Sequence, residues 1–135
     1  MMGGKMTMRD LSQLYYLNKE IPDEEERLYR LESEAQRCTA ALSGMPGSGA
    51  ENDRIGKLGA EIADLREVIQ AKILLRTAER RKLERYIADI EDSYLRQIMV
   101  ARFIDGLSWS RVANRIGGNN TGDGCRMAVK RFLAK

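Results

Sequence analysis

The strongest structural signal in the chain is a repeat of apolar residues within residues 52–75, which read NDRIGKLGAEIADLREVIQAKILL. These residues recur at alternating spacings of three and four, the heptad pattern of a helix that packs on another helix. Asn52 or Asp53 is suited to cap the start of this helix. A helix over residues 54–88 would be roughly 50 Å long at ~1.5 Å per residue. The heptad positions are Ile55, Leu58, Ile62, Leu65 and Ile69.

A second heptad stripe lies over residues 14–42 and predicts the partner helix. Thr7 can cap this helix, and Asp10 three residues later completes an approximate capping box. Pro22 interrupts the stripe and is followed by four acids, as at a new helix start. We therefore expect a break or kink near residues 20–22. The stripe consists of Leu14, Leu17, Ile21, Leu28, Leu31, Ala35, Cys38 and Leu42.

A glycine-rich loop, SGMPGSG at residues 43–49, joins the two stripes. A loop of this length between two heptad helices predicts that they pack antiparallel. The expected fold class is therefore all-α, with a long, coiled-coil-like antiparallel helical hairpin over residues 7–82. Because so long a stripe exceeds what one partner helix is expected to cover, we also expect a homo-oligomer, a dimer or higher.

Composition excludes several classes of function. The 135 residues include no histidine, which excludes Ser-His-Asp triads, Cys-His dyads and histidine zinc sites. The two cysteines, Cys38 and Cys125, are too few for a disulfide framework and share no metal-ligand spacing. We expect no catalytic residues, no cofactor and no metal, and hence no enzyme. No apolar run approaches the ~20 residues of a membrane span and no leader is evident, so we expect a cytoplasmic protein without a membrane partner.

Basic side chains are concentrated in the last third of the chain. Residues 92–135 carry eight basic and three acidic side chains, whereas residues 1–50 carry six basic and eight acidic ones. Residues 51–91 are balanced, with nine of each. A small basic region at the end of a balanced chain favours a polyanionic partner, usually nucleic acid, and a solvated basic face is the alternative.

The same last third predicts three short helices. The first opens at residues 91–93 and ends at Gly106, a typical glycine stop. Ser108 then caps a helix over residues 109–116 and, after a glycine turn, Thr121 caps the last helix. A short helix, a turn and a second helix form a helix-turn-helix pattern, in which the second helix enters the major groove of DNA.

The helix-turn-helix domain is expected over residues 83–135 and is expected to fold alone as a monomeric module. Its exposed side is expected to bind double-stranded DNA. Arg126 is placed to contact bases, because arginine can reach guanine O6 and N7 together, whereas Lys130 and Arg131 are placed on phosphates. The expected DNA-binding residues are Arg111, Arg115, Thr121, Asp123, Arg126, Met127, Lys130 and Arg131.

Residues 102–113, RFIDGLSWSRVA, together with Thr121 and residues 131–133, resemble the promoter-reading region 4 of bacterial sigma factors. With the heptad hairpin and the loop at residues 43–49, the chain is similar to small phage and prophage regulators of the ArpU/RinA type. This resemblance implies a phage-encoded, DNA-binding transcriptional regulator, and it adds RNA polymerase as a candidate partner.

Two features of the chain depart from the sigma pattern. The turn is about two residues longer, and the reading helix begins with Gly122-Asp123-Gly124, where that pattern usually has long polar side chains. Two glycines weaken a helix by about 1 kcal/mol each and make no side-chain contact with a base, so specific reading would depend mainly on Arg126. The alternative is an oligomeric phage assembly or adaptor protein, or a small-terminase-like protein, that binds DNA non-specifically.

Overall fold

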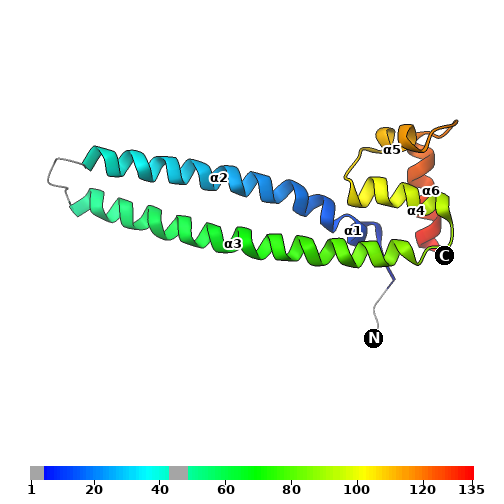
Figure 1. Ribbon diagram of the computed structural model, residues 1–135, viewed down its shortest axis with the longest axis horizontal. Coiled ribbons are helices and arrows are strands. Elements are labelled where there is room, and N and C mark those ends of the chain that lie inside the picture. The colour runs from blue at the N-terminus through cyan, green and yellow to red at the C-terminus, as the bar shows by residue number, and fades with distance from the viewer. Residues whose placement is uncertain (1–4, 43–48) are drawn as a thin grey trace. The chain divides into compact units, whose positions relative to one another are not determined.

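The computed structural model describes residues 5–42 and 49–135, and every regular element within them is helical (Figure 1). The all-α class is thereby confirmed for the described part of the chain. The loop expected at residues 43–49 falls outside the described residues except for Gly49, which begins α3. The elements are α1 (Met8–Leu11), α2 (Gln13–Leu42), α3 (Gly49–Ala88), α4 (Ser93–Met99), the π-helix η1 (Val100–Ile104), α5 (Trp109–Ile116) and α6 (Gly122–Ala134).

The N-terminal helix is interrupted at Ser12 and not at Pro22. The expected capping box is confirmed, because the Thr7 hydroxyl accepts from the Asp10 amide and the Asp10 carboxylate accepts from the Thr7 amide. Two residues after Asp10, the Ser12 hydroxyl donates to the carbonyl of Met8 at 2.8 Å, and the Ser12 amide is shared between the carbonyls of Met8 and Arg9. This local bonding competes with the regular helix and separates α1 from α2.

Of the break or kink expected near residues 20–22, the break is wrong, because α2 runs through Pro22 as one helix. A proline removes one backbone hydrogen bond, which packing can offset. Lys72 on α3 pairs with both Glu20 and Glu24, which bracket Pro22 on α2. The hydrogen bond that the Lys72 ammonium donates to the Glu24 carboxylate also raises the pKa of Lys72. The acids that follow Pro22 therefore lie inside α2 and do not open a new helix.

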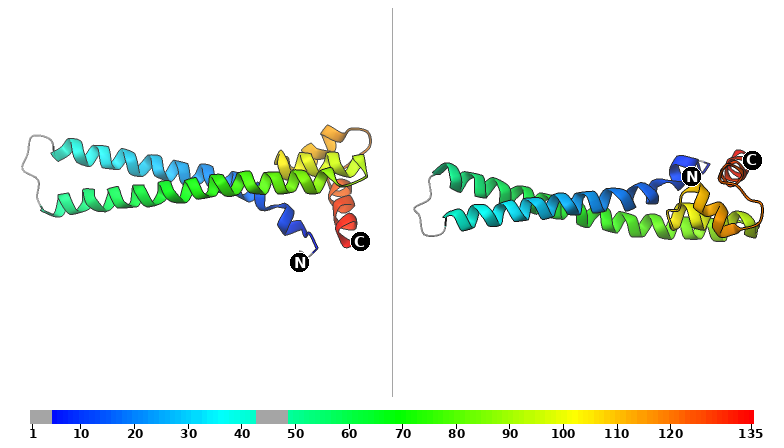
Figure 2. Two further views of the ribbon diagram at one scale, coloured as in Figure 1. Left: turned by 60° about the horizontal axis from the view of Figure 1, so that its bottom comes forward. Right: turned by 90° about the horizontal axis from the view of Figure 1, so that it is seen from above.

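Residues Lys19–Leu75 form one compact unit, here called the helix-pair unit. Its parts of α2 and α3 lie side by side and antiparallel (Figures 1 and 2). Arg66 and Arg54 on α3 pair with Glu32 and Glu34 on α2. Part of the heptad stripe is buried within a single copy, whereas Leu28, Leu31, Ala35, Cys38 and Ile55 are only half-buried, so one copy does not cover the whole stripe. The buried residues of this unit are Ile21, Leu58, Ile62, Leu65 and Ile69.

Residues Met1–Asn18 and Arg76–Lys135 form a second compact unit, here called the terminal unit. Its hydrophobic core includes Leu11 and Leu14 from the N-terminal segment. The structure thus draws the boundaries elsewhere than the sequence-based ranges of 7–82 and 83–135, because these two leucines are buried among the C-terminal helices. The rest of the core consists of Leu83, Ile87, Ile90, Leu95, Ile98, Met99, Ala101, Phe103, Ile104, Val112, Ala113, Cys125 and Val129.

The short helices of the terminal unit begin and end close to where the sequence predicts. Asp92 caps α4, and its carboxylate accepts from the amide of Tyr94 at 2.9 Å. The helix that was expected to reach Gly106 changes to the π-helix η1 after Met99. The chain then leaves the helix at Gly106, where φ is +74° and glycine is favoured.

Candidate nucleic-acid interface

The α5–α6 pair is built on two side-chain caps and a glycine turn, all as the sequence predicts. The Ser108 hydroxyl accepts from the amide of Arg111, and the Thr121 hydroxyl accepts from the amide of Gly124. Gly117 and Gly118 both adopt positive φ between the helices. Their turn is bonded through Asn120, whose amide donates to the carbonyl of Gly117 at 2.7 Å and whose oxygen accepts from the hydroxyl of Tyr94 on α4 at 2.8 Å.

Packing favours glycine at position 122, and the sequence of the helix alone does not indicate this. A Cβ at this position would lie 3.1 Å from the carbonyl carbon of Trp109 and 3.2 Å from the amide nitrogen of Ser110. Both atoms belong to the backbone of α5 and cannot rotate away. The start of α6 therefore lies so close to the start of α5 that a larger residue would require the two backbones to separate by a few tenths of an ångström.

We expect Gly122→Ala to lower the free energy of unfolding by about 1–3 kcal/mol, as overpacking does, although alanine is intrinsically the better helix former. Gly59→Ala on α3 is the matched control, because a Cβ there meets nothing within 4 Å. It should raise the stability by about 1 kcal/mol. Urea unfolding of both variants measures the two effects, and a gain of stability at both positions would contradict the close approach.

Four of the expected DNA-binding residues form an exposed or half-buried surface on α6. Cys125 and Val129 on the same helix are fully buried, which fixes the side of the helix that faces solvent. Asp123 lies in the first turn with its side chain exposed, 3.9 Å from the guanidinium of Arg126. The surface, here called the α6 surface, consists of Arg126, Met127, Lys130 and Arg131.

The remaining expected residues take different positions. Arg111 is exposed on α5. Arg115 is bound to the carboxylate of Asp105 at 2.6 Å, so its charge is largely neutralised within the terminal unit. Thr121 acts as the helix cap, and its hydroxyl is already committed to the backbone of α6.

A hollow of about 260 Å³ lies beside the α6 surface and brings in residues that sequence reasoning missed. Arg126 and Lys130 line it together with Arg102, so that three cationic side chains and no acid face the space. Met8 and Ser12 from the N-terminal segment complete the wall, next to Phe103 and Trp109. The sequence predicts that Thr7 caps a helix, but no local sequence pattern indicates where that helix packs.

Arg102 is held between two aromatic rings. Its guanidinium carbon lies 5.1 Å from the ring centre of Tyr15 on α2 and 4.8 Å from that of Trp109 on α5. It also donates to the carbonyl of Leu107 at 3.0 Å. Arg102 therefore links the start of α2, η1 and α5, and it places positive charge beside the α6 surface.

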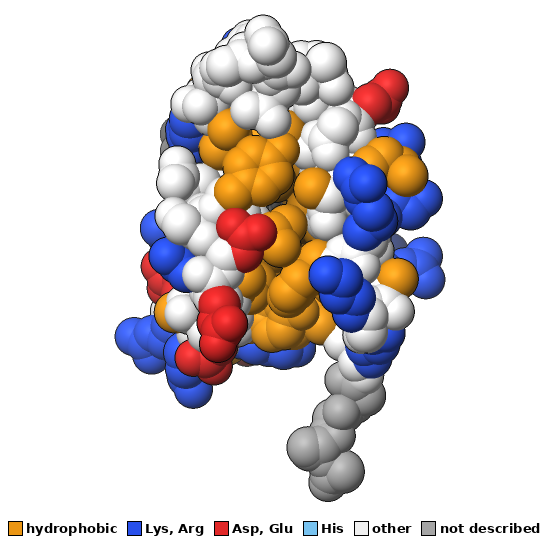
Figure 3. Space-filling model, turned by 90° about the vertical axis from the view of Figure 1, so that its right-hand side faces the viewer, with side chains coloured by type: hydrophobic (Ala, Val, Ile, Leu, Met, Phe, Trp, Pro, Cys, Tyr) orange, Lys and Arg blue, Asp and Glu red, His pale blue; other side chains and the backbone are white. Residues whose placement is uncertain are grey.

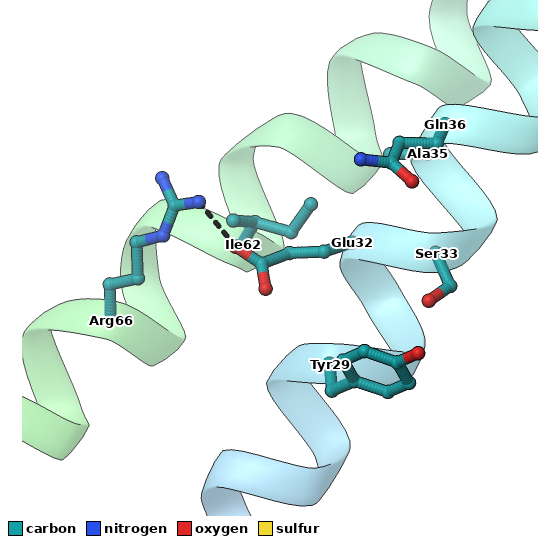
Figure 4. A pocket seen from close by; sticks show the side chains of 7 residues that line it. All are labelled: Tyr29, Glu32, Ser33, Ala35, Gln36, Ile62 and Arg66. Carbon is teal, nitrogen blue, oxygen red and sulfur yellow. Dashed lines mark hydrogen bonds and ion pairs between the residues drawn. The ribbon is translucent and has the colours of Figure 1, made fainter.

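A second hollow, of about 380 Å³, lies on the helix-pair unit (Figure 4). The ion pair of Arg66 with Glu32 crosses it beside Ile62, and Tyr29 forms part of its wall. The lining has a single carboxylate, and that carboxylate is bound to arginine. The hollow therefore supplies no pair of carboxylates for acid–base chemistry.

The metal-binding and membrane-spanning features of the chain can be stated for residues 5–42 and 49–135. These ranges contain no group of three or more histidine, cysteine, aspartate or glutamate side chains arranged to hold a metal. None of the helices described there combines the length and the apolar character needed to cross a membrane. Cys38 is half-buried and Cys125 is buried, and both are free thiols.

Comparison of the chain with protein-family models, with curated proteins and with solved structures gives no match.

Proposed function

We propose that the protein is a phage-type, DNA-binding transcriptional regulator in which α5 and α6 act as a helix-turn-helix similar to sigma region 4. One observation carries the proposal. The α6 helix is capped by Thr121 and buries Cys125 and Val129 completely, whereas of its three basic side chains Lys130 and Arg131 are exposed and Arg126 is half-buried beside the core. A capped helix with one buried and one basic side is suited to the major groove.

The residues of the α6 surface are suited to different contacts with DNA, because their side chains and positions differ. Arg126 is one turn into the helix, and arginine is the side chain that best reads guanine by two hydrogen bonds. Lys130 and Arg131 lie further along α6 and are suited to phosphates, as is Arg111 on α5. Arg115 contributes less than expected, because it is bound to Asp105. The resemblance to sigma region 4 also implies RNA polymerase as a second partner.

The test compares two single variants on specific and scrambled duplexes, after selection of a cognate site from genomic fragments. Arg126→Ala should cost about 1–3 kcal/mol on the cognate site and leave binding to the scrambled duplex comparatively intact. Lys130→Ala should weaken binding to both duplexes about equally and reduce the steepness of the salt dependence by about one unit. Titrations at several salt concentrations measure both effects, and each variant is the control for the other.

The second candidate function is an assembly or adaptor protein that binds DNA by charge alone. Two observations favour it: Gly122 and Gly124 offer no side chain to a base at the start of α6, and Asp123 lies beside Arg126. If Arg126→Ala weakens binding to both duplexes by the same factor, Arg126 is a phosphate contact and this candidate replaces the regulator.

A further inference from the structure

A hollow of about 660 Å³ lies in the terminal unit where the end of α3, the start of α4 and the end of α6 meet. Its floor is apolar, and its rim is charged. Figure 3 shows apolar side chains gathered along the middle of this face, with acidic side chains directly beside them on one side and basic side chains on the other, and with further basic side chains beyond the acidic ones. The floor consists of Tyr86, Ile90, Leu95 and Phe132, and the charged rim consists of Asp89, Glu91, Asp92 and Lys135.

The two sides of this groove come from different helices and carry opposite charge. Asp89 and Glu91 lie at the end of α3 and just beyond it, and Lys135 follows α6. Arg131, one turn before Lys135, extends the basic side. Among the described residues, no ion pair joins the acidic side to the basic side or involves Asp89, Glu91 or Lys135.

We propose that a second copy of this chain occupies the groove, related to the first by a two-fold axis. A two-fold interface is self-complementary, because the same patch on each copy must match itself. An apolar strip with acids on one side and bases on the other meets this condition when the two-fold axis runs along the strip, because the acidic side of each copy then lies over the basic side of the other. Asp89 of each copy then faces Lys135 of the other, and Phe132 and Tyr86 become covered from both sides.

The charges around the groove favour a second copy of the chain over nucleic acid or a basic peptide as the occupant. Nucleic acid is disfavoured, because three of the four charged rim residues are acidic. A basic peptide would match the acidic side but would leave Lys135 facing like charge. Burial already raises the pKa of Tyr86, which indicates that the floor is partly removed from water in one copy. None of the residues that line the groove belongs to the α6 surface, and only Arg131 beside it is shared, so the dimer does not require the proposed function.

The test uses reversed charges on the full chain and sedimentation equilibrium over a range of concentrations. Asp89→Lys alone and Lys135→Glu alone should each weaken self-association at least tenfold, because like charges then face each other on both sides of the apolar strip. An equimolar mixture of the two variants should recover association, because each altered side then faces its opposite. Lys57→Glu, an exposed position on α3 in the helix-pair unit, is the control and should associate like the unaltered chain.

Both altered positions are exposed, so the variants should fold, and circular dichroism checks this. The proposal is overturned if the unaltered chain is monomeric throughout the concentration range. It is equally overturned if the single variants associate as the unaltered chain does, which would place the interface elsewhere. Loss of association in both variants without recovery in the mixture would also overturn it, because the two sides would then not face each other. DNA affinity is measured separately, so failure here leaves the proposed function open.

Discussion

Replacing Leu11 with alanine is expected to lower the free energy of unfolding by about 2–5 kcal/mol, although Leu11 lies far from the C-terminal helices in sequence. Its side chain is 0% exposed and belongs to the core that also holds Leu83, Phe103 and Val112. Removal of its methyl groups leaves a cavity that a packed helical core fills only partly. Urea unfolding followed by the fluorescence of Trp109, the single tryptophan of the chain, reports on this unit directly.

Leu74→Ala is the matched control for this loss, because the same atoms are removed from a side chain that is 71% exposed. Its effect should stay within about 0.5 kcal/mol. Equal effects at Leu11 and Leu74 would show that the N-terminal segment is not part of the core in solution. For the same reason, residues 83–135 are not expected to fold alone, contrary to the expectation from sequence. A fragment of these residues lacks Leu11 and Leu14, which belong to the same core.

Helix positions in the chain could be predicted because their signals are local. The caps at Thr7, Ser108 and Thr121 each need a hydroxyl and an amide two or three residues later, and both are fixed by the adjacent sequence. The stop at Gly106 likewise depends on one residue with positive φ. The heptad stripe of α3 predicts which side of the helix is buried, and Leu58, Ile62 and Leu65 are buried accordingly.

The errors arise where contacts distant in sequence decide the local structure. Pro22 by itself favours a helix break, but the pairs of Lys72 with Glu20 and Glu24 hold the helix on both sides of it. The docking of Leu11 into the terminal unit likewise depends on residues of α3 to α6. No pattern within one helix contains this information.

The candidate interface likewise has some features that the sequence predicts and others that depend on tertiary contacts. The side of α6 that faces solvent follows from the helical period, and Arg126 and Lys130 lie on the surface of the terminal unit. The pairing of Arg115 with Asp105 and the position of Arg102 between two aromatic rings depend on how three elements meet. The reason for Gly122 is visible only in its distance to the backbone of α5.

Neutralising the residues that we propose to contact phosphates is expected to have the largest effect on DNA binding. Each basic side chain that neutralises one phosphate contributes about 0.9 to the slope of log K against log salt concentration, because it releases condensed counterions. A triple alanine variant should therefore lower the steepness of this slope by about 2.7. Arg115 is left in place, since Asp105 already neutralises it. The three positions are Arg111, Lys130 and Arg131.

A second triple alanine variant on α3 separates a local effect from the loss of net charge. Arg80 pairs with Glu84 and Lys82 with Glu79 along the helix, and Arg81 is exposed between them. Replacing these three residues removes the same total charge, but we expect it to leave the salt slope close to that of the unaltered chain, because none of the three belongs to the α6 surface. Fluorescence anisotropy titrations on one duplex at several salt concentrations give both slopes. Equal changes of slope in the two variants would mean that DNA responds to the overall charge or also contacts this part of α3, and the α6 surface would then not be the principal interface.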